Sequence, residues 1–291
     1  MWFYFAIMSA AVNAVSTIAR RTHGSTAKPV ELAWWTLLIS LPCSIALLVI
    51  DHSTPWVNYD FLLPSIAAGT ISAFAVVLLL TAYKYGETSA ITPISNLLPI
   101  GLVISSFIFF DTIPTIGGLL GIILVVCGVY YSSVDGKHSL WHPFRSLWHQ
   151  RGSRAMLWVV ILWSISTNFQ LMALHSASPA FLVLWVQLIS FILLTMYMTV
   201  QETRAKTRTR VWERWWKHIV IMAIGSTLAV YFQNQAMVLL DNTSYVLAVK
   251  RLDVLIVILF CGLFLHEKHI LKRFSGALVA LAGIVVIYIF N

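Results

Sequence analysis

The chain alternates between long apolar stretches and short polar connections. Each stretch holds about 20 residues, and a helix of that length rises 1.5 Å per residue and crosses roughly 30 Å of hydrocarbon. The pattern predicts ten such helices, at about residues 2–19, 31–50, 61–83, 89–110, 115–134, 155–175, 178–200, 218–239, 244–265 and 274–290. The expected fold is therefore an all-α membrane protein with ten transmembrane helices.

Positive charge gathers in every second connection. The first, third, fifth, seventh and ninth connections hold all but two of the 19 Lys and Arg residues, whereas the even connections hold Asp51, Asp60, Asp111 and Asp241. Because short basic loops remain in the cytoplasm, we expect cytoplasmic odd connections and both termini outside. We expect a multi-pass protein of a bacterial inner (plasma) membrane.

The composition excludes several classes of protein. Only 10% of the residues are charged and 59% are apolar, so a soluble domain could not cover its apolar surface. The net charge of +8 lies beside the apolar stretches, which favours membrane orientation over binding of nucleic acid. Cys43, Cys127 and Cys261 stand singly, so neither a metal site nor a cofactor is expected.

Polar, Gly and Trp residues recur at a nearly constant offset along the chain. Pairs at an offset of 155 include Ser9 with Ser164, Asn13 with Asn168, Gly121 with Gly276 and Gly128 with Gly283. The predicted domains are a first five-helix repeat (1–134), a basic cytoplasmic linker (135–154) and a second five-helix repeat (155–291). An odd number of crossings per repeat inverts the second copy, and two inverted repeats suit secondary transport by alternating access. The sequence contains no phosphate-binding loop of the GxxxxGK[ST] type, so nothing in it supports an ATP-driven pump.

The repeated features resemble the EamA-type drug/metabolite transporter superfamily. The residues that carry the resemblance run from Pro99 to Asp111 with Gly121 and Gly128, and from Ala248 to Glu267 with Gly276 and Gly283. The resemblance implies a ten-helix fold and transport without ATP. It leaves the substrate open among amino acids, sugars, nucleotide sugars, phosphorylated sugars and quaternary amines.

Lys250, Arg251 and Asp253 form the sharpest local signal, because charged side chains inside a membrane helix are rare and usually face a cavity or a partner. The Lys250-Arg251 pair also resembles the phosphate-binding pair of the plastid sugar-phosphate branch, but Asp253 follows two residues later, which speaks against an anionic substrate. The second half also has Leu255 where the first half has Pro99. Lys250 and Asp253 share a helix face and are expected to pair, which leaves Arg251 for a ligand. In the alternative reading the helix begins later, and the three lie at the outer surface.

Amides inside the apolar stretches supply further candidates. Asn13 and Asn168 occupy equivalent places in the two repeats, where they either meet a substrate or bond the two halves together. Gln233 and Asn234, beside Tyr231, are expected to line a cavity, and Gln170 is a weaker candidate. The predicted substrate-binding residues are therefore Lys250, Arg251, Asp253, Asn13, Asn168, Gln233, Asn234, Gln170 and Tyr231.

The sequence thus favours a secondary transporter of a small polar metabolite, with an anionic substrate as one option. The alternative is an exporter of amino acids or cationic amines, with Asp253 as the amine or proton site. An enzyme is not expected, because the stretches lack a nucleophile paired with a base. The small-residue faces of stretches five and ten fit either packing between the two halves or a homodimer.

Overall fold

The computed structural model describes residues 1–23, 28–52, 58–111, 113–133, 141–202, 211–257 and 270–290, where every regular element is an α-helix. The first half contains α1 (Trp2–His23), α2 (Pro29–Ile50), α3 (Tyr59–Tyr85), α4 (Thr88–Ser95), α5 (Leu98–Phe110) and α6 (Ile116–Ser133). The second half contains α7 (His142–His149), α8 (Arg151–Leu174), α9 (Pro179–Glu202), α10 (Val211–Leu240), α11 (Thr243–Lys250) and α13 (Ile270–Phe290).

Eight segments in the described ranges are long and apolar enough to cross a membrane. They coincide with the first eight predicted stretches, and one of them, Ala90–Phe110, covers α5 and all but the first two residues of α4. The ninth stretch lies partly outside the described residues, and Glu267 lies among those that are not described. In the tenth, the apolar helical part is the shorter Ser275–Phe290.

Short polar residues fix where some of these apolar helices begin. The side chain of Asn58 accepts a hydrogen bond from the backbone N–H of Phe61 at the start of α3, and Asn242 accepts from Ser244 and Tyr245 at the start of α11. These amides satisfy N–H groups that have no partner within the helix. Pro29 begins α2, where its missing N–H costs nothing.

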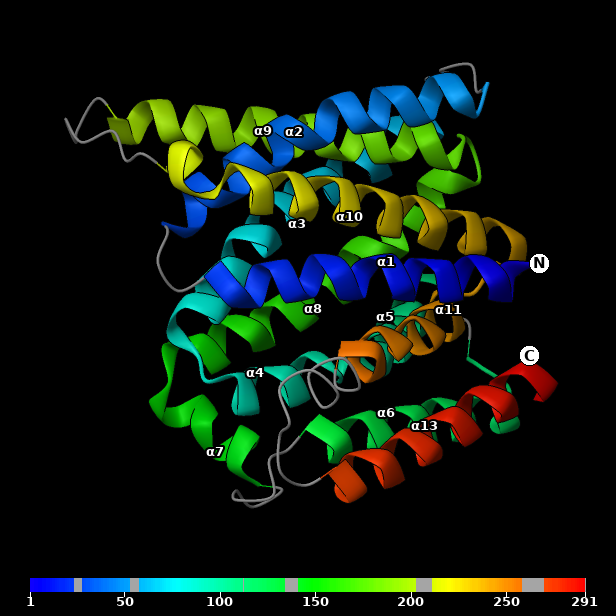
Figure 1. The fold of residues 1–291 in the computed structure, drawn as a ribbon. Coiled ribbons are helices and arrows are strands. Elements are labelled where there is room, and N and C mark those ends of the chain that lie inside the picture. Colours follow the sequence, from blue (N-terminus) through cyan, green and yellow to red (C-terminus); the bar gives the residue numbers. More distant parts are fainter. Residues whose placement is uncertain are drawn as a thin grey trace.

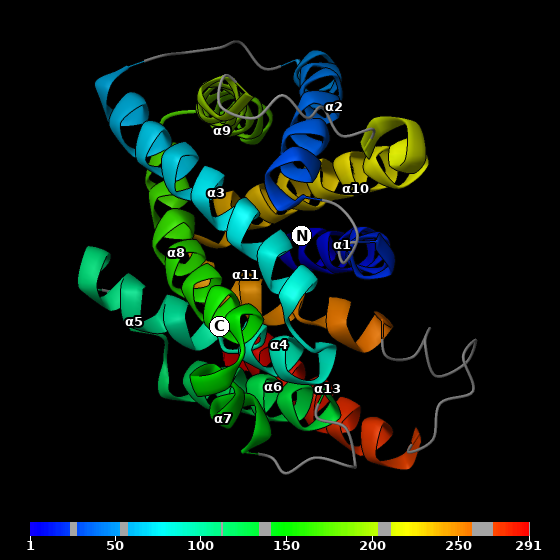
Figure 2. The same ribbon diagram turned by 90° about the vertical axis from the view of Figure 1, so that its left-hand side faces the viewer.

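Helices from the two halves pack against each other in pairs. The first half's α1, α2, α3 and α6 lie along α10, α9, α8 and α13 of the second half, respectively. Figure 1 shows α2 and α9 at one edge of the bundle and α6 with α13 at the opposite edge, and Figure 2 shows the same arrangement after a turn. Both chain termini lie at the same end of the bundle (Figure 1).

Glycines bring α6 and α13 close together. A Cβ added at Gly128 would lie 2.6 Å from the backbone oxygen of Gly276, and one added at Gly283 would lie 2.7 Å from the oxygen of Gly121. Larger side chains would force the helices apart, so these small-residue faces pack the two halves against each other. The faces considered for a homodimer are therefore occupied within one chain.

Two helical segments are broken at matching places. In the first half, α4 ends at Ser95 and α5 starts at Leu98, with Pro93 and Pro99 flanking the break. Proline has no N–H and disfavours helical geometry in the preceding residue, which accounts for this interruption. In the second half α11 ends at Lys250, Arg251 forms a turn, and helix resumes at Leu252. The caps Asn96 and Arg251 are 155 positions apart.

Candidate functional site

A cavity of about 250 Å³ lies between the two halves, in the middle of the bundle. Side chains from α1, α2, α3, α4, α5, α8, α9, α10 and α11 line it, together with Arg251, Asp253 and Val254 at and after the helix break. Its wall is mostly apolar, with polar groups from both halves, which is the usual character of a site for a small molecule.

A polar stripe along α1 reaches into this cavity. Asn13, Thr17 and Arg20 all line it, and their spacing of four and then three residues places them on one face of the helix. The Arg20 guanidinium donates to the hydroxyl oxygen of Ser16, with its Nη2 2.5 Å and its Nε 3.2 Å away. Arg20 thus folds back along its own helix toward the cavity.

The helix break after α11 places three charged groups in the same cavity. Lys250 ends α11, where a positive charge is favourable, and Asp253 lies in the first turn of the next helical segment, where a negative charge is favourable. The Asp253 carboxylate also accepts a hydrogen bond from the backbone N–H of Val254 at 2.7 Å. The predicted trio of Lys250, Arg251 and Asp253 therefore faces the cavity, and the alternative placement at the outer surface is not what the structure has.

Hydrogen bonds across the cavity join the two halves. Asn13 donates from Nδ2 to Oδ2 of Asp253 at 2.6 Å, and its Oδ1 lies 3.5 Å from the donating Nη2 of Arg20. Lys250 donates to Oε1 of Gln233 at 2.6 Å, rather than forming the expected pair with Asp253. Asn13 therefore links a cation of the first half to an anion of the second.

Positive charge exceeds negative charge among the described residues that line the cavity. Arg20, Lys250 and Arg251 face one acid, Asp253, whose side chain is 4% exposed and which interacts electrostatically with all three. In addition, Nε of Arg251 is buried without a hydrogen-bond partner. Buried charges are stable only when paired and hydrogen-bonded, so this cluster is incomplete as it stands.

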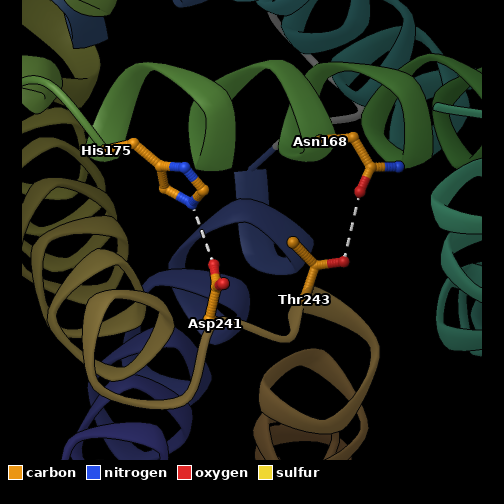
Figure 3. A network of polar contacts seen from close by, with 4 residues as sticks. All are labelled: Asn168, His175, Asp241 and Thr243. Carbon is orange, nitrogen blue, oxygen red and sulfur yellow. Dashed lines mark hydrogen bonds and ion pairs between the residues drawn. The ribbon is translucent and has the colours of Figure 1, made fainter. Parts of the chain in front are cut away.

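Six of the nine predicted site residues line the cavity: Asn13, Gln170, Gln233, Lys250, Arg251 and Asp253. Asn168 belongs to a different region, the junction where α8 meets α5 and the start of α11. There its side chain donates to Ser105 at 2.7 Å and accepts from Ser106 at 2.9 Å and from Thr243 at 3.3 Å. Figure 3 shows Asn168 directed at Thr243 and, at the C-terminal end of the same helix, His175 directed at Asp241.

The other two predicted residues also lie away from the cavity. Tyr231 donates its hydroxyl hydrogen to Asp51 at 3.0 Å and accepts from Gln235. Asn234 is fully buried, and neither polar atom of its side chain has a partner. Gln233 and Asn234 are adjacent on α10 and point about 100° apart, so only Gln233 faces the cavity.

Sequence reasoning missed Arg20, which it assigned to the first basic connection. The helix α1 runs to His23, four residues beyond the predicted end at 19, and this extension puts Arg20 within the helix. The polar spacing that starts at Asn13 and continues through Thr17 is a signal that could have identified it. A loop residue and a cavity residue look alike when a boundary is drawn from apolarity alone.

Two of three comparisons place this architecture among known proteins. The model of the EamA-like transporter family matches residues 1–134 and 150–289, one match for each half of the chain. A solved crystal structure covers 98% of both chains with a TM-score of 0.72 and 14% sequence identity, which shows a shared fold. A search of curated proteins finds no match. With its apolar helices, the chain is a multi-pass integral membrane protein, and it belongs to the EamA-like transporter family.

Proposed function

We propose that this protein is a secondary transporter that moves a small anionic metabolite across the membrane by alternating access. The observation that carries the proposal is the cavity between the two halves, which three cations and one carboxylate line together in the described part of the chain. An excess of fixed positive charge in a confined, largely apolar site favours a negatively charged ligand. The broken helix beside it is a recurrent device for binding charged substrates in transporters.

An inverted repeat of two five-helix halves, with ten crossings in all, is the architecture we propose. Exchanging the halves turns the packing of α1 along α10 into the packing of α8 along α3, and both are present. The same exchange leaves α2 with α9, and α6 with α13, as they are. The helix breaks at Asn96 and Arg251 correspond in the same way. These matches support two halves that can rock about the cavity between them.

The orientation we propose has the odd connections in the cytoplasm of a bacterium and both termini outside. The basic odd connections support it, and the termini lie at one end of the bundle (Figure 1). Arg20 and Tyr83 line the cavity near the C-terminal ends of α1 and α3, which lead into odd connections. At the opposite end, the Asn168 cluster joins α8, α5 and α11. The cavity thus reaches toward the cytoplasmic end, whereas hydrogen bonds join the helices at the other end. This difference between the two ends supports a state that is closed toward the outside.

The exporter of amines has weaker support from the same cavity. An amine would need a free carboxylate, but both oxygens of Asp253 already accept hydrogen bonds, from Asn13 and from Val254. Three neighbouring cations would also repel it. Asp253 is better suited to holding the binding residues in place.

Transport by purified full-length protein in liposomes tests the proposal. Labelled small anions, amines and neutral sugars are compared in a counterflow assay, with Arg251→Gln as the test variant and Arg145→Gln, an exposed residue of α7, as its control. We expect accumulation of anions, lowered about tenfold or more by Arg251→Gln because a charge-assisted hydrogen bond is lost, and unchanged in the control. Accumulation of amines or neutral solutes only would contradict the proposal.

A further inference from the structure

We infer that the cargo of this cavity is a small organic dianion, held between Arg20 of the first half and Arg251 of the second. This inference rests on the anion transport proposed above and specifies its substrate class. It concerns the charge of the cargo rather than its carbon skeleton, so dicarboxylates and phosphate monoesters both qualify. Arg20 is a binding residue that neither the family match nor the apolar pattern identifies.

The count of charged side chains in the cavity indicates a cargo with two negative charges. Both guanidinium groups stay protonated in any protein environment. Lys250 and Asp253 offset each other when both are ionised, and equally when a proton has passed between them and both are neutral. Of the charged groups that line the cavity in the described part of the chain, the two arginines remain uncompensated. A dianion neutralises them, whereas a monoanion leaves one charge buried at a high energetic cost.

The hydrogen-bond donors of the two arginines point to the same class of ligand. A guanidinium has five N–H donors, arranged to fit the paired oxygens of a carboxylate or phosphate. Nε of Arg251 is buried without any acceptor. Arg20 is bonded to the neutral oxygens of Ser16 and Asn13. Both arginines therefore retain capacity for a charged acceptor.

The two arginines are also close enough to act on one ligand. Each of them interacts electrostatically with Asp253 and with Tyr83, and both line the same cavity of about 250 Å³. Arg20 lies on α1 and Arg251 on the break that follows α11, so a bound dianion would connect the two halves. A site of this volume restricts the cargo to a small molecule.

Asp253 sets how many charges the site accepts. It fixes Asn13, which in turn contacts Arg20, and it provides the one negative charge that the cavity contains in its described part. Removing Arg20 should therefore lower the preferred charge of the cargo by one, and removing the charge of Asp253 should raise it by one. Changing both should restore the original preference.

Binding to purified full-length protein in detergent tests this charge rule. The probes are succinate and glycerol 3-phosphate as dianions, butyrate as a monoanion, tricarballylate as a trianion and putrescine as a dication. Affinities come from ligand-dependent shifts in melting temperature and from calorimetry. For the unchanged protein we expect a dianion to bind about tenfold or more tightly than butyrate. Which of the two dianions binds better distinguishes a carboxylate from a phosphate cargo.

Five variants complete the test. We expect Arg20→Gln to shift preference toward butyrate, Asp253→Asn to shift it toward tricarballylate, and the double variant Arg20→Gln with Asp253→Asn to return it to the dianions. Arg145→Gln is the matched control and should leave all affinities unchanged. Arg20→Lys keeps the charge and should keep the dianion preference with weaker binding, which separates charge from folding. Size-exclusion profiles identify any variant that fails to fold.

The outcomes separate the inference from the function on which it rests. If butyrate binds as tightly as the dianions, or if the double variant fails to restore dianion preference while remaining folded, the dianion rule is overturned and anion transport stands. If only putrescine binds, both the inference and the proposed function are wrong. Dianion preference that follows the charge count through all five variants supports both.

Discussion

Asn13 and Asn168 occupy equivalent positions in the two halves and have opposite surroundings. Asn13 lies at the cavity and bonds to charged side chains, Asp253 and Arg20. Asn168 is 1% exposed and bonds to hydroxyl groups in the junction of α8, α5 and α11. The same amide therefore serves a charged, incomplete site in one half and a neutral, satisfied contact in the other.

This difference is what the proposed alternating access would require of two related halves. In one conformation, one side of the bundle must be held shut while the other remains open to the cavity. Hydrogen bonds between neutral groups in a membrane are weak enough to break during transport, at about 0.6 kcal/mol each on average. Clustered charges cost much more to leave unpaired, so in the proposed mechanism they would select the cargo.

The largest expected effect comes from removing the acid of the charged region. Asp253→Ala would leave Arg20, Lys250 and Arg251 without their counter-ion, and breaking a buried charge pairing costs about 3–5 kcal/mol. Thermal unfolding in detergent should show a much lower melting temperature for this variant. Asp60→Ala, an exposed acid in the first turn of α3, is the control and should change it little. Equal stability of the two variants would show that Asp253 does not balance the cations.

The next largest effect is expected from replacing Asn13, and it should distinguish the role of Asn13 from that of Asn168. Asn13→Leu would remove the bond to Asp253, and leaving a buried charged acceptor unsatisfied costs about 1–3 kcal/mol. We expect dianion affinity to fall about tenfold, because Asp253 and Arg20 lose the group that positions them. Calorimetric titration measures this affinity. An affinity equal to that of the unchanged protein would remove Asn13 from the site.

Asn168→Leu is the matched change in the second half. It would leave the hydroxyl groups of Ser105, Ser106 and Thr243 without their shared partner, at a cost of about 0.6–1.7 kcal/mol. The junction should open more readily, while dianion affinity stays the same. Hydrogen exchange of the α5 and α11 backbone measures the opening. A loss of dianion affinity equal to that of Asn13→Leu would abolish the distinction between the two regions.

The smallest effect is expected at the edge of the junction. His175 and Asp241 form a contact of 2.9 Å, but their side chains are 55% and 68% exposed (Figure 3). An exposed pair of this kind contributes about 0.2–1 kcal/mol at most. His175→Gln should therefore lower the melting temperature only slightly, and a large loss would mean that the edge contact, rather than Asn168, holds the junction.

The fold was more predictable from the sequence than the site, for physical reasons. Apolar stretches and basic connections report directly on lipid and water, so the first eight stretches match the helices. Which side of a helix faces the cavity depends on neighbouring helices. Gln233 and Asn234 are equally polar and adjacent, yet only Gln233 lines the cavity, and Asn168 bonds within the bundle.

Charge inside a predicted stretch was the more informative signal. Lys250, Arg251 and Asp253 were identified because their presence in an apolar stretch is costly without a purpose. Their actual partners could not be predicted, since they depend on how helices pack: Gln233 lies on the preceding helix, and Asn13 lies 240 positions away from Asp253 on the first helix. Arg20 was missed because a cation at the end of an apolar stretch is ordinary.

Labelling of one cavity residue tests the central claim most directly. In a cysteine-free background, Thr17→Cys places a thiol in the cavity lining beside Arg20, where a membrane-impermeant maleimide can report access. The account predicts labelling from the side of the odd connections and protection by a transported dianion, with weaker protection by butyrate at the same concentration and none by putrescine. Labelling that stays unchanged while the protein is saturated with an anion it transports would contradict a cargo site in this cavity.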